Sequence, residues 1–253
     1  MENEKTNEEV IEIVTEKKRK KWFEFLKKIM KVRYKKPAFM YLGEKIDEPC
    51  LILSNHEGTD APMSLEIYTD FPMRMWGAHE MNSGLRKMYD YQTKVYFHEK
   101  KHWNLFLARC FCLLASPLTN MFYKGLNLIS TYKDGRFIIT IKESIKTLQR
   151  GESVVIFPEK SDKGYLEELE GINKGFVLLL ESCLKKGQDV NIVCSYFRKS
   201  DKVYIIDKKV KYSELASKYD RDEIAQVVLN RINELGKMEF TSEEIENARK
   251  EIK

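Results

Sequence analysis

Apolar residues follow two alternating patterns along this chain. Short, nearly continuous apolar runs, typical of buried strands, lie at 38–46, 50–55, 71–78, 125–131, 153–159, 189–197 and 202–207, with a polar turn at 47–49 joining the first two. Segments with helical character lie at 61–68, 134–151, 175–187, 221–235 and 241–252. Strands that alternate with helices predict an α/β fold with a mostly parallel central sheet flanked by helices. The length of 253 residues suits a single domain of this kind.

The first 36 residues are predicted to form a basic amphipathic helix. Residues 17–36 hold much of the basic charge of a chain whose formal net charge is +5. Over 16–34, one helical stripe carries Trp22, Phe25, Leu26, Ile29 and Met30, flanked by lysines. Such a helix is suited to a membrane surface, with its lysines near anionic lipid, or it packs on the domain as an ordinary amphipathic helix. Basic and aromatic residues do not interleave elsewhere, so nucleic acid is not an expected partner.

The most apolar stretch, 103–123, is long enough to cross a bilayer but is interrupted by Arg109, Pro117 and Asn120. We therefore expect a helix that lies in the membrane interface or is buried, rather than one that spans the membrane. The five cysteines include no C-x-x-C pair and predict reduced thiols, and the acidic, polar N-terminus is unlike a secretory signal. These features predict a peripheral or monotopic protein on the cytoplasmic face of a membrane. The expected organisation is a helix over 1–36, an α/β domain over 37–235 and a charged tail over 236–253.

Candidate chemistry gathers where two predicted strands end. His56 and Glu159 each follow such a strand, and ligands of parallel sheets bind beyond the carboxyl ends of the strands. An imidazole titrates near neutral pH, and Asp60 can orient it if Gly58 allows a tight, open turn. Alternatively, Asp60 caps the helix that begins near Pro62, and His56 is a polar loop residue. No second histidine stands at ligand spacing, so a metal site is not expected.

Three motifs follow one another over residues 37–207. They are "SNHEGTDAP", with Asn55, His56 and Asp60, then "FPEKSDK", with Glu159 and Ser161, and finally "NKGFVLLL", with Lys174. In this order and at these separations, the motifs resemble those of the 1-acyl-glycerol-3-phosphate (lysophosphatidic acid) acyltransferase family, in the glycerolipid acyltransferase superfamily. The chain resembles a divergent member, and the resemblance implies a glycerolipid-acyltransferase-like α/β domain.

The resemblance also implies a function, a membrane-associated acyltransferase of phospholipid biosynthesis. Such an enzyme moves a fatty acyl group from acyl-CoA or acyl-carrier protein, as co-substrate, to a lysophospholipid or related lipid hydroxyl. His56 is then the general base and Asp60 orients its imidazole, with no metal or other cofactor. The residues implied in substrate binding are Asn55, Glu159, Ser161 and Lys174.

Two features depart from the family's pattern. The interval between His56 and Asp60 is one residue shorter, and Thr131 and Asp162 stand where phosphate-binding arginines are expected. Neither side chain replaces a guanidinium fork. Four nearby cations are expected to serve as point charges instead, namely Lys133, Arg136, Lys160 and Lys163. The same departures support an alternative function, in which a catalytically impaired relative binds lipid or a partner protein through the same cleft.

Overall fold

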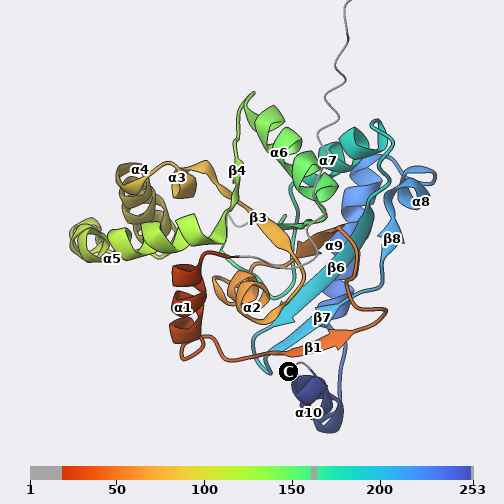
Figure 1. Ribbon diagram of the computed structural model, residues 1–253, viewed down its shortest axis with the longest axis horizontal. Helices are drawn as coiled ribbons and strands as arrows, with labels where there is room; N and C mark the ends of the chain where they lie inside the picture. Colours follow the sequence, from red (N-terminus) through yellow and green to blue (C-terminus); the bar gives the residue numbers. More distant parts are fainter. Residues whose placement is uncertain (1–18, 161–163, 252–253) are drawn as a thin grey trace, which may run out of the picture.

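The apolar runs of the sequence form one eight-stranded sheet in this computed structural model, which describes residues 19–160 and 164–251 (Figure 1). The strands are β1 (Ala38–Tyr41), β2 (Cys50–Ser54), β3 (Met73–Ala78), β4 (Ile129–Thr131), β5 (Ser153–Ile156), β6 (Asn191–Arg198), β7 (Val203–Ile206) and β8 (Val210–Lys211). Their order is β1-β7-β6-β2-β5-β3-β4, and β8 pairs with β6. Each predicted apolar run contains one of these strands, whereas β8 was not predicted.

Five neighbouring strands of the sheet, β6, β2, β5, β3 and β4, run parallel, so their carboxyl ends lie along one edge. β7 runs antiparallel to β6, and β1 pairs in parallel with β7. The polar segment at 47–49 connects β1 to β2, but the two strands are not neighbours, because β1 pairs with β7 from Ala38↔Val203 to Tyr41↔Ile206. The crossovers among the five parallel strands carry helices, as parallel pairing requires. The predicted α/β fold with a mostly parallel sheet is therefore confirmed.

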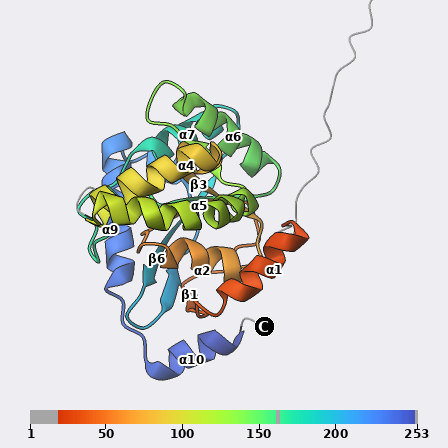
Figure 2. The same ribbon diagram turned by 90° about the vertical axis from the view of Figure 1, so that its left-hand side faces the viewer.

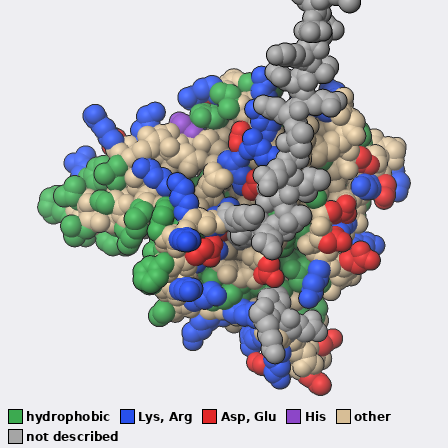
Figure 3. All heavy atoms as spheres, in the orientation of Figure 1, with side chains coloured by type: hydrophobic (Ala, Val, Ile, Leu, Met, Phe, Trp, Pro, Cys, Tyr) green, Lys and Arg blue, Asp and Glu red, His purple; other side chains and the backbone are tan. Residues whose placement is uncertain are grey.

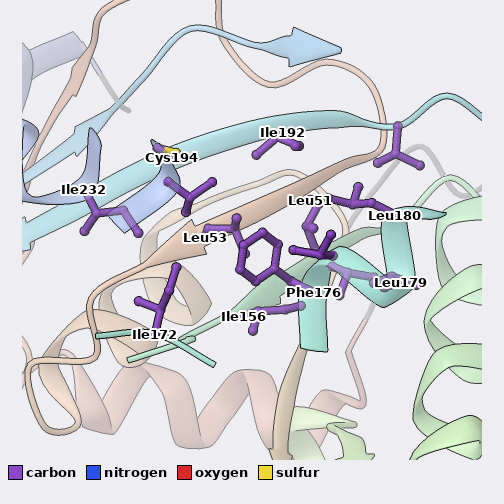
Figure 4. Close-up of a cluster of buried hydrophobic side chains, with 14 of the residues drawn as sticks. Leu51, Leu53, Ile156, Ile172, Phe176, Leu179, Leu180, Ile192, Cys194 and Ile232 are labelled. Atoms are coloured by element: carbon purple, nitrogen blue, oxygen red, sulfur yellow. The ribbon is translucent and has the colours of Figure 1, made fainter. Parts of the chain in front are cut away.

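Helices cover both faces of the sheet, because alternate residues of each strand point to opposite sides. Leu51 and Leu53 of β2 belong to one buried cluster, and Ile52 belongs to the other. The first cluster lies under α6 (Phe137–Gln149), α7 (Gly175–Leu184) and α9 (Arg221–Gly236). Figure 4 shows Phe176 of α7 among its strand neighbours. The second cluster lies under α1 (Lys21–Met30), α2 (Asp60–Tyr68) and the C-terminal end of α5 (Leu105–Leu126).

A group of helices projects from one side of the sheet (Figures 1 and 2). It contains α3 (His79–Asn82), α4 (Leu85–Asp90), the π-helical segment η1 (Tyr91–Lys100) and α5. The Phe97 ring of η1 lies 4.8 Å from the Trp103 ring and 5.1 Å from the Phe111 ring, centroid to centroid, so aromatic packing joins η1 to α5. The sequence pattern predicted α5 but not the helices between 79 and 100.

The C-terminal segment, expected as a charged tail with a helix over 241–252, forms the helix α10 (Ser242–Glu251) and packs against the edge strand β1. Ala248 is buried in the first cluster, and the Arg249 guanidinium donates a hydrogen bond of 2.9 Å to the carbonyl of Asp201. The short helix α8 (Tyr212–Ala216) follows β8, and α9 begins with a capping box formed by Asp220 and Glu223.

The N-terminal helix α1 packs on the domain through one side and exposes the other. Phe23 is fully buried in the second cluster, whereas Trp22, Phe25 and Ile29 of the predicted stripe are 38%, 66% and 54% exposed. Most of the stripe therefore faces away from the domain, although Leu26 packs against the second cluster. The part of this predicted element that precedes residue 19 lies outside the described residues.

The exposed apolar side chains continue from α1 onto α5. Figure 3 shows hydrophobic side chains gathered over the projecting helices. The strongly exposed ones on α5 are Phe106, Leu107, Leu113, Leu114 and Leu118. By length and composition alone, α5 is the one helix among the described residues that could cross a membrane.

Candidate active site

The carboxyl edge of the sheet has a topological switch point between β2 and β5. The chain leaves β2 for α2 on one face of the sheet, and it leaves β5 for α7 on the other face. Ligands of open α/β sheets bind where neighbouring parallel strands connect to opposite faces. His56 is the second residue after β2, and Phe157, Pro158 and Glu159 directly follow β5, which pairs with β2. The first two sequence motifs therefore meet at this point.

The His56 imidazole contacts two aromatic rings. It stacks on the Tyr165 ring at 4.9 Å between centroids, with 23° between the planes, and it lies 4.9 Å from the tilted ring of Phe157. Burial raises the pKa of the Tyr165 phenol above its ordinary value, and the charge of Glu159 adds to this rise. Tyr165 therefore stays protonated at neutral pH and presents an O–H group beside the imidazole.

A tight turn links β2 to α2 and presents His56 at its start. Glu57 and Gly58 both have positive φ angles, 38° and 64°, and the Asp60 amide donates a hydrogen bond to the Glu57 carbonyl at 3.2 Å. Left-handed backbone is uncommon for a residue other than glycine, and it concentrates at functional sites. Asp60 is the first residue of α2. The turn thus separates the imidazole from the Asp60 carboxylate by three tightly folded residues.

Asn55, expected to bind substrate, is instead occupied by the protein. Its side-chain amide donates to the Phe197 carbonyl of β6 at 2.9 Å and accepts from the Phe197 amide at 2.7 Å. The residue is 1% exposed. This pair of bonds continues the β2–β6 ladder one residue beyond the strand, and it fixes the backbone from which His56 projects. Both the N–H and the C=O group of the Asn55 side chain are therefore engaged by the backbone of β6.

Asp60 forms ion pairs with two cations from distant parts of the chain. One carboxylate oxygen lies 3.7 Å from the Arg33 guanidinium, and the other lies 3.3 Å from the Lys199 ammonium. Lys199 also lies 3.5 Å from the Glu57 carboxylate. The hydrogen bond with Asp60 is the largest cause that raises the pKa of Lys199. Among the contacts of the described residues, these ion pairs, and no bond between His56 and Asp60, engage the Asp60 carboxylate.

Glu159 lies in a short stretch that pairs with residues 171–173. It forms an isolated antiparallel bridge with Ile172, and the neighbouring Lys160 amide donates to the Gly171 carbonyl at 2.9 Å. The Asn173 amide donates to the Pro158 carbonyl at 2.6 Å. Glu159 is 9% exposed, so this pairing buries its carboxylate close to Tyr165.

Two of the predicted cations follow β4. Lys133 is exposed, whereas the Arg136 guanidinium pairs with both oxygens of Asp134 and lies 4.6 Å from the Tyr132 ring centroid. The Arg136 hydrogen bonds lower the pKa of Asp134 to about 2. Thr131, at the position where the family's arginine is expected, donates its hydroxyl to the Gly77 carbonyl at 2.9 Å.

The other predicted binding residues are dispersed. Lys174 is half-exposed and pairs with Asp222 of α9 at 2.6 Å, in the helical layer of α7 and α9. Lys160 is exposed beside Glu159. Ser161 and Lys163, together with Asp162, lie outside the described residues.

Four residues that the sequence analysis did not predict contact His56 or the turn that leads to Asp60. They are Arg33, Tyr34, Tyr165 and Lys199. Besides the ion pairs of Arg33 and Lys199, the Tyr34 hydroxyl bonds to the Thr59 hydroxyl at 3.0 Å. Sequence patterns gave no signal for Arg33 and Tyr34, because they lie in a run of lysines after α1. Lys199 carried one usable signal, since it follows the carboxyl end of a predicted parallel strand.

A cavity of about 370 Å³ lies away from these residues, beside β6, β8 and α9. Its walls include Cys194, Val228 and the Arg231–Asp207 ion pair, and none of its lining residues was predicted to bind substrate. Within residues 19–160 and 164–251, no group of three His, Cys, Asp or Glu side chains is arranged to hold a metal ion.

Comparisons with known proteins support the fold. No protein-family model matches the chain, and no curated protein matches it by sequence. Among solved structures, it is similar to the 1-acyl-sn-glycerophosphate (LPA) acyltransferase PlsC from Thermotoga maritima. The similarity covers 87% of this chain and 81% of that chain, with a TM-score of 0.50 and 13% sequence identity. The two chains share an acyltransferase-like α/β fold.

Proposed function

We propose that this protein is an acyltransferase that moves a fatty acyl group from acyl-CoA or acyl-carrier protein to the hydroxyl of a lysophospholipid or a related lipid. The observation that carries the proposal is the position of His56. It lies at the switch point of a sheet whose fold is similar to that of an LPA acyltransferase, and its ring contacts Phe157 of the second motif. Fold similarity alone would not support an activity, but a basic side chain at this point does.

In the proposed reaction, His56 takes the proton of the acceptor hydroxyl while that oxygen attacks the carbonyl carbon of the thioester. The C–S bond then breaks, and the leaving thiolate takes the proton from the imidazolium. The products are an ester and a free thiol, and no acyl-enzyme is formed. Asp60 stabilises the positive charge that His56 carries during the reaction. Backbone N–H groups near the switch point would stabilise the oxyanion.

The lipid acceptor suggests a site at a membrane surface. The exposed apolar residues of α1 and α5 form the surface that we propose to contact lipid, with the lysines of α1 near anionic head groups. This proposal places the protein on the cytoplasmic face of a membrane, as a peripheral or monotopic enzyme of phospholipid synthesis. The segment that follows α1 contacts the turn after His56 through the Tyr34–Thr59 hydrogen bond.

An acceptor panel tests the proposed activity. Labelled acyl-CoA and acyl-carrier protein are each incubated with a series of lysolipids, monoacylglycerols and sugar lipids, and the labelled ester is measured. His56→Gln is expected to lower the rate by about 10²–10⁴-fold, because proton removal is lost. His98→Gln and Cys110→Ala, at exposed positions on the projecting helices, are the controls. If no thioester is consumed with any acceptor, the proposed activity is refuted, and the alternative, a catalytically impaired relative that binds lipid or a partner protein, is favoured.

A further inference from the structure

We propose that a cluster of four tyrosines beside His56 binds the head group of the acyl acceptor, and that this head group is an uncharged glycerol or sugar. We call these residues the phenol cluster, and they are Tyr91, Tyr96, Tyr123 and Tyr165. The inference rests on the proposed acyltransferase function and adds to it the class of acceptor. It departs from the phosphate-bearing acceptor that the sequence resemblance implies.

The phenol cluster comes from three parts of the chain that meet at the site. Tyr91 and Tyr96 belong to η1, Tyr123 belongs to α5, and Tyr165 lies in the segment after β5. The Tyr165 ring stacks on the His56 imidazole at 4.9 Å between centroids. Burial is the main cause that raises the pKa of Tyr165, and the other three phenols add to the rise, so all of them lie within electrostatic reach of its hydroxyl.

The π-helical winding of η1 places two of the phenols on one side. Hydrogen bonds from residue i to residue i+5 set side chains that are five residues apart one above the other, as Tyr91 and Tyr96 are. In an α-helix, with 3.6 residues per turn, the same two side chains point in clearly different directions. π-Helical turns are rare and occur frequently at functional sites. The winding of η1 therefore supports a binding role for this pair of phenols.

A polar stripe of α5 faces η1. Ser116, Asn120 and Tyr123 follow one another at intervals of four and three residues, so they share one side of the helix. The Ser116 hydroxyl donates a hydrogen bond of 3.0 Å to the Gln92 side chain of η1. The Oδ1 atom of Asn120 is buried and accepts no hydrogen bond from the described residues. Asn120, which interrupts the apolar run of the sequence, thus offers an acceptor beside Tyr123 that the protein does not use.

The phenol cluster keeps its hydrogen-bonding capacity. Within residues 19–160 and 164–251, no hydrogen bond joins the four hydroxyls to another residue. Burial is the main cause that raises the pKa of each phenol, so all four stay protonated at neutral pH and can both donate and accept. The hydroxyls of a glycerol or sugar have the same two capacities, and its carbon atoms can pack on the aromatic rings. Such a head group therefore matches both parts of the tyrosine side chain.

The charges around the phenol cluster disfavour a phosphate. Three carboxylates add to the rise in pKa that burial causes, namely Glu80 at Tyr91, Asp60 at Tyr96 and Glu159 at Tyr165. The same negative charges repel a phosphate, which carries about −1.5 to −2 at neutral pH. Burial among the rings adds a desolvation cost that a dianion pays and an uncharged head group largely avoids.

Three cations near the sequence motifs already pair with carboxylates. The Arg136 guanidinium is held by both oxygens of Asp134. Arg33 and Lys199 lie 3.7 and 3.3 Å from the two oxygens of Asp60. A phosphate would have to compete with these carboxylates, whereas an uncharged head group displaces no ion pair.

Binding to the whole protein tests the class of head group without turnover. The probes share a six-carbon chain and differ in the head group, and they are hexanoylglycerol, hexyl glucoside and hexanoyl-lysophosphatidate. Calorimetry measures their binding to the wild type and to Tyr96→Phe and Tyr123→Phe, which keep the ring and lose only the hydroxyl. Tyr219→Phe, at an exposed position on the C-terminal side of α8, is the matched control.

We expect one of the two uncharged probes to bind more tightly than hexanoyl-lysophosphatidate, by about tenfold or more. The tighter of the two identifies the head group as glycerol or sugar. Tyr96→Phe and Tyr123→Phe should each weaken this binding by about two- to tenfold, because each loses one hydrogen bond to the ligand. Tyr219→Phe should bind as the wild type does.

The proposal is overturned if hexanoyl-lysophosphatidate binds at least as tightly as both uncharged probes, if neither uncharged probe binds, or if Tyr96→Phe and Tyr123→Phe bind as Tyr219→Phe does. The expected binding without acyl transfer to any acceptor would refute the proposed activity and retain the phenol cluster as a site for an uncharged head group. Acyl transfer to lysophosphatidate alone would retain the activity and overturn the inference.

Discussion

The position of His56 depends on its neighbour Asn55. The Asn55 amide makes both of its bonds to the backbone of Phe197, at 2.9 and 2.7 Å, in a fully buried setting. Backbone groups that are buried without a partner are costly, so a side chain that satisfies two of them at once holds β2 and β6 in register beyond their last ladder bond. The backbone that precedes His56 is therefore held in place by these two hydrogen bonds.

Asn55→Ala is expected to lower the free energy of unfolding by about 2–4 kcal/mol, because it leaves the buried N–H and C=O of Phe197 unsatisfied. Urea denaturation followed by circular dichroism measures the change. Asn230→Ala, at an exposed position on α9, is the control and should change stability by less than about 0.5 kcal/mol. Equal urea midpoints for the two variants would show that the two Asn55–Phe197 hydrogen bonds do not stabilise the fold.

At this scale, sequence reasoning located His56, the proposed base, but not the groups around it. His56 and Glu159 were found because parallel strands place their carboxyl ends on one edge, which is a property of the local pattern. Arg33 and Lys199 converge on Asp60 only through tertiary packing, and no local pattern encodes that. The same limit applies to Asn55, because a motif does not show whether an amide faces the substrate or the backbone.

Among the elements, α1 contacts the domain through the buried Phe23 ring and through a buried charge cluster. Phe23 lies so close to Gly125 of α5 that a Cβ atom there would stand 2.0 Å from the ring. Below it, the Glu66 carboxylate of α2 pairs with Arg19 at 3.2 Å and with Lys27 at 3.6 Å. These contacts set the position of α1, and the segment that follows the helix contacts the turn at 57–59 through the Tyr34–Thr59 hydrogen bond.

Gly125→Ala is expected to displace Phe23 and to destabilise the packing of α1 by about 1–3 kcal/mol, because the added methyl group overlaps the ring. Hydrogen exchange measured by mass spectrometry should become faster in α1 and in the turn at 57–59. Gly135→Ala, where an added Cβ meets no atom within 4 Å, is the matched control. Unchanged exchange in α1 would mean that the helix packs independently of this contact.

The elements that the sequence predicted were those with a clear period or a continuous apolar run. The helices between 79 and 100 were missed because that segment is polar and aromatic without a regular period, and packing on α5 supplies their stability. The partner of β1 was also missed. A turn between two strands favours pairing between them, but β1 instead extends the sheet beyond β7.

For the whole molecule, buried thiols predict a loss of stability at high pH. Burial raises the pKa of Cys50 and of Cys194 from 9.0 to about 12. Between these values, the unfolded chain has lost the two protons while the folded protein keeps them, so the free energy of unfolding falls as the pH rises from about 9 to 12. Below about pH 9, the two thiols make no contribution to this slope.

Each of these thiols should contribute a slope of up to about 1.4 kcal/mol per pH unit in that window. Urea midpoints measured from pH 7 to 11 test this, and Cys50→Ala should reduce the alkaline slope relative to the wild type. Cys110→Ala, at an exposed position, is the control and should leave the slope unchanged. A midpoint that stays constant up to pH 11 would contradict the expected effect of burial.

The exposed apolar area formed by α1 and α5 predicts whether the protein binds to lipid membranes. If this area contacts lipid, then Phe106→Ser, Leu113→Ser and Leu114→Ser together should abolish flotation with liposomes containing anionic phospholipid, because each removes an exposed apolar side chain worth roughly 1.5–3 kcal/mol of transfer free energy. Leu178→Ser with Leu184→Ser, at exposed positions on α7 over the opposite face of the sheet, is the control. Rising salt should weaken flotation as well, since lysines on α1 attract anionic head groups. Flotation that survives the α5 substitutions, or that the α7 substitutions reduce equally, would show that lipid does not bind at this surface.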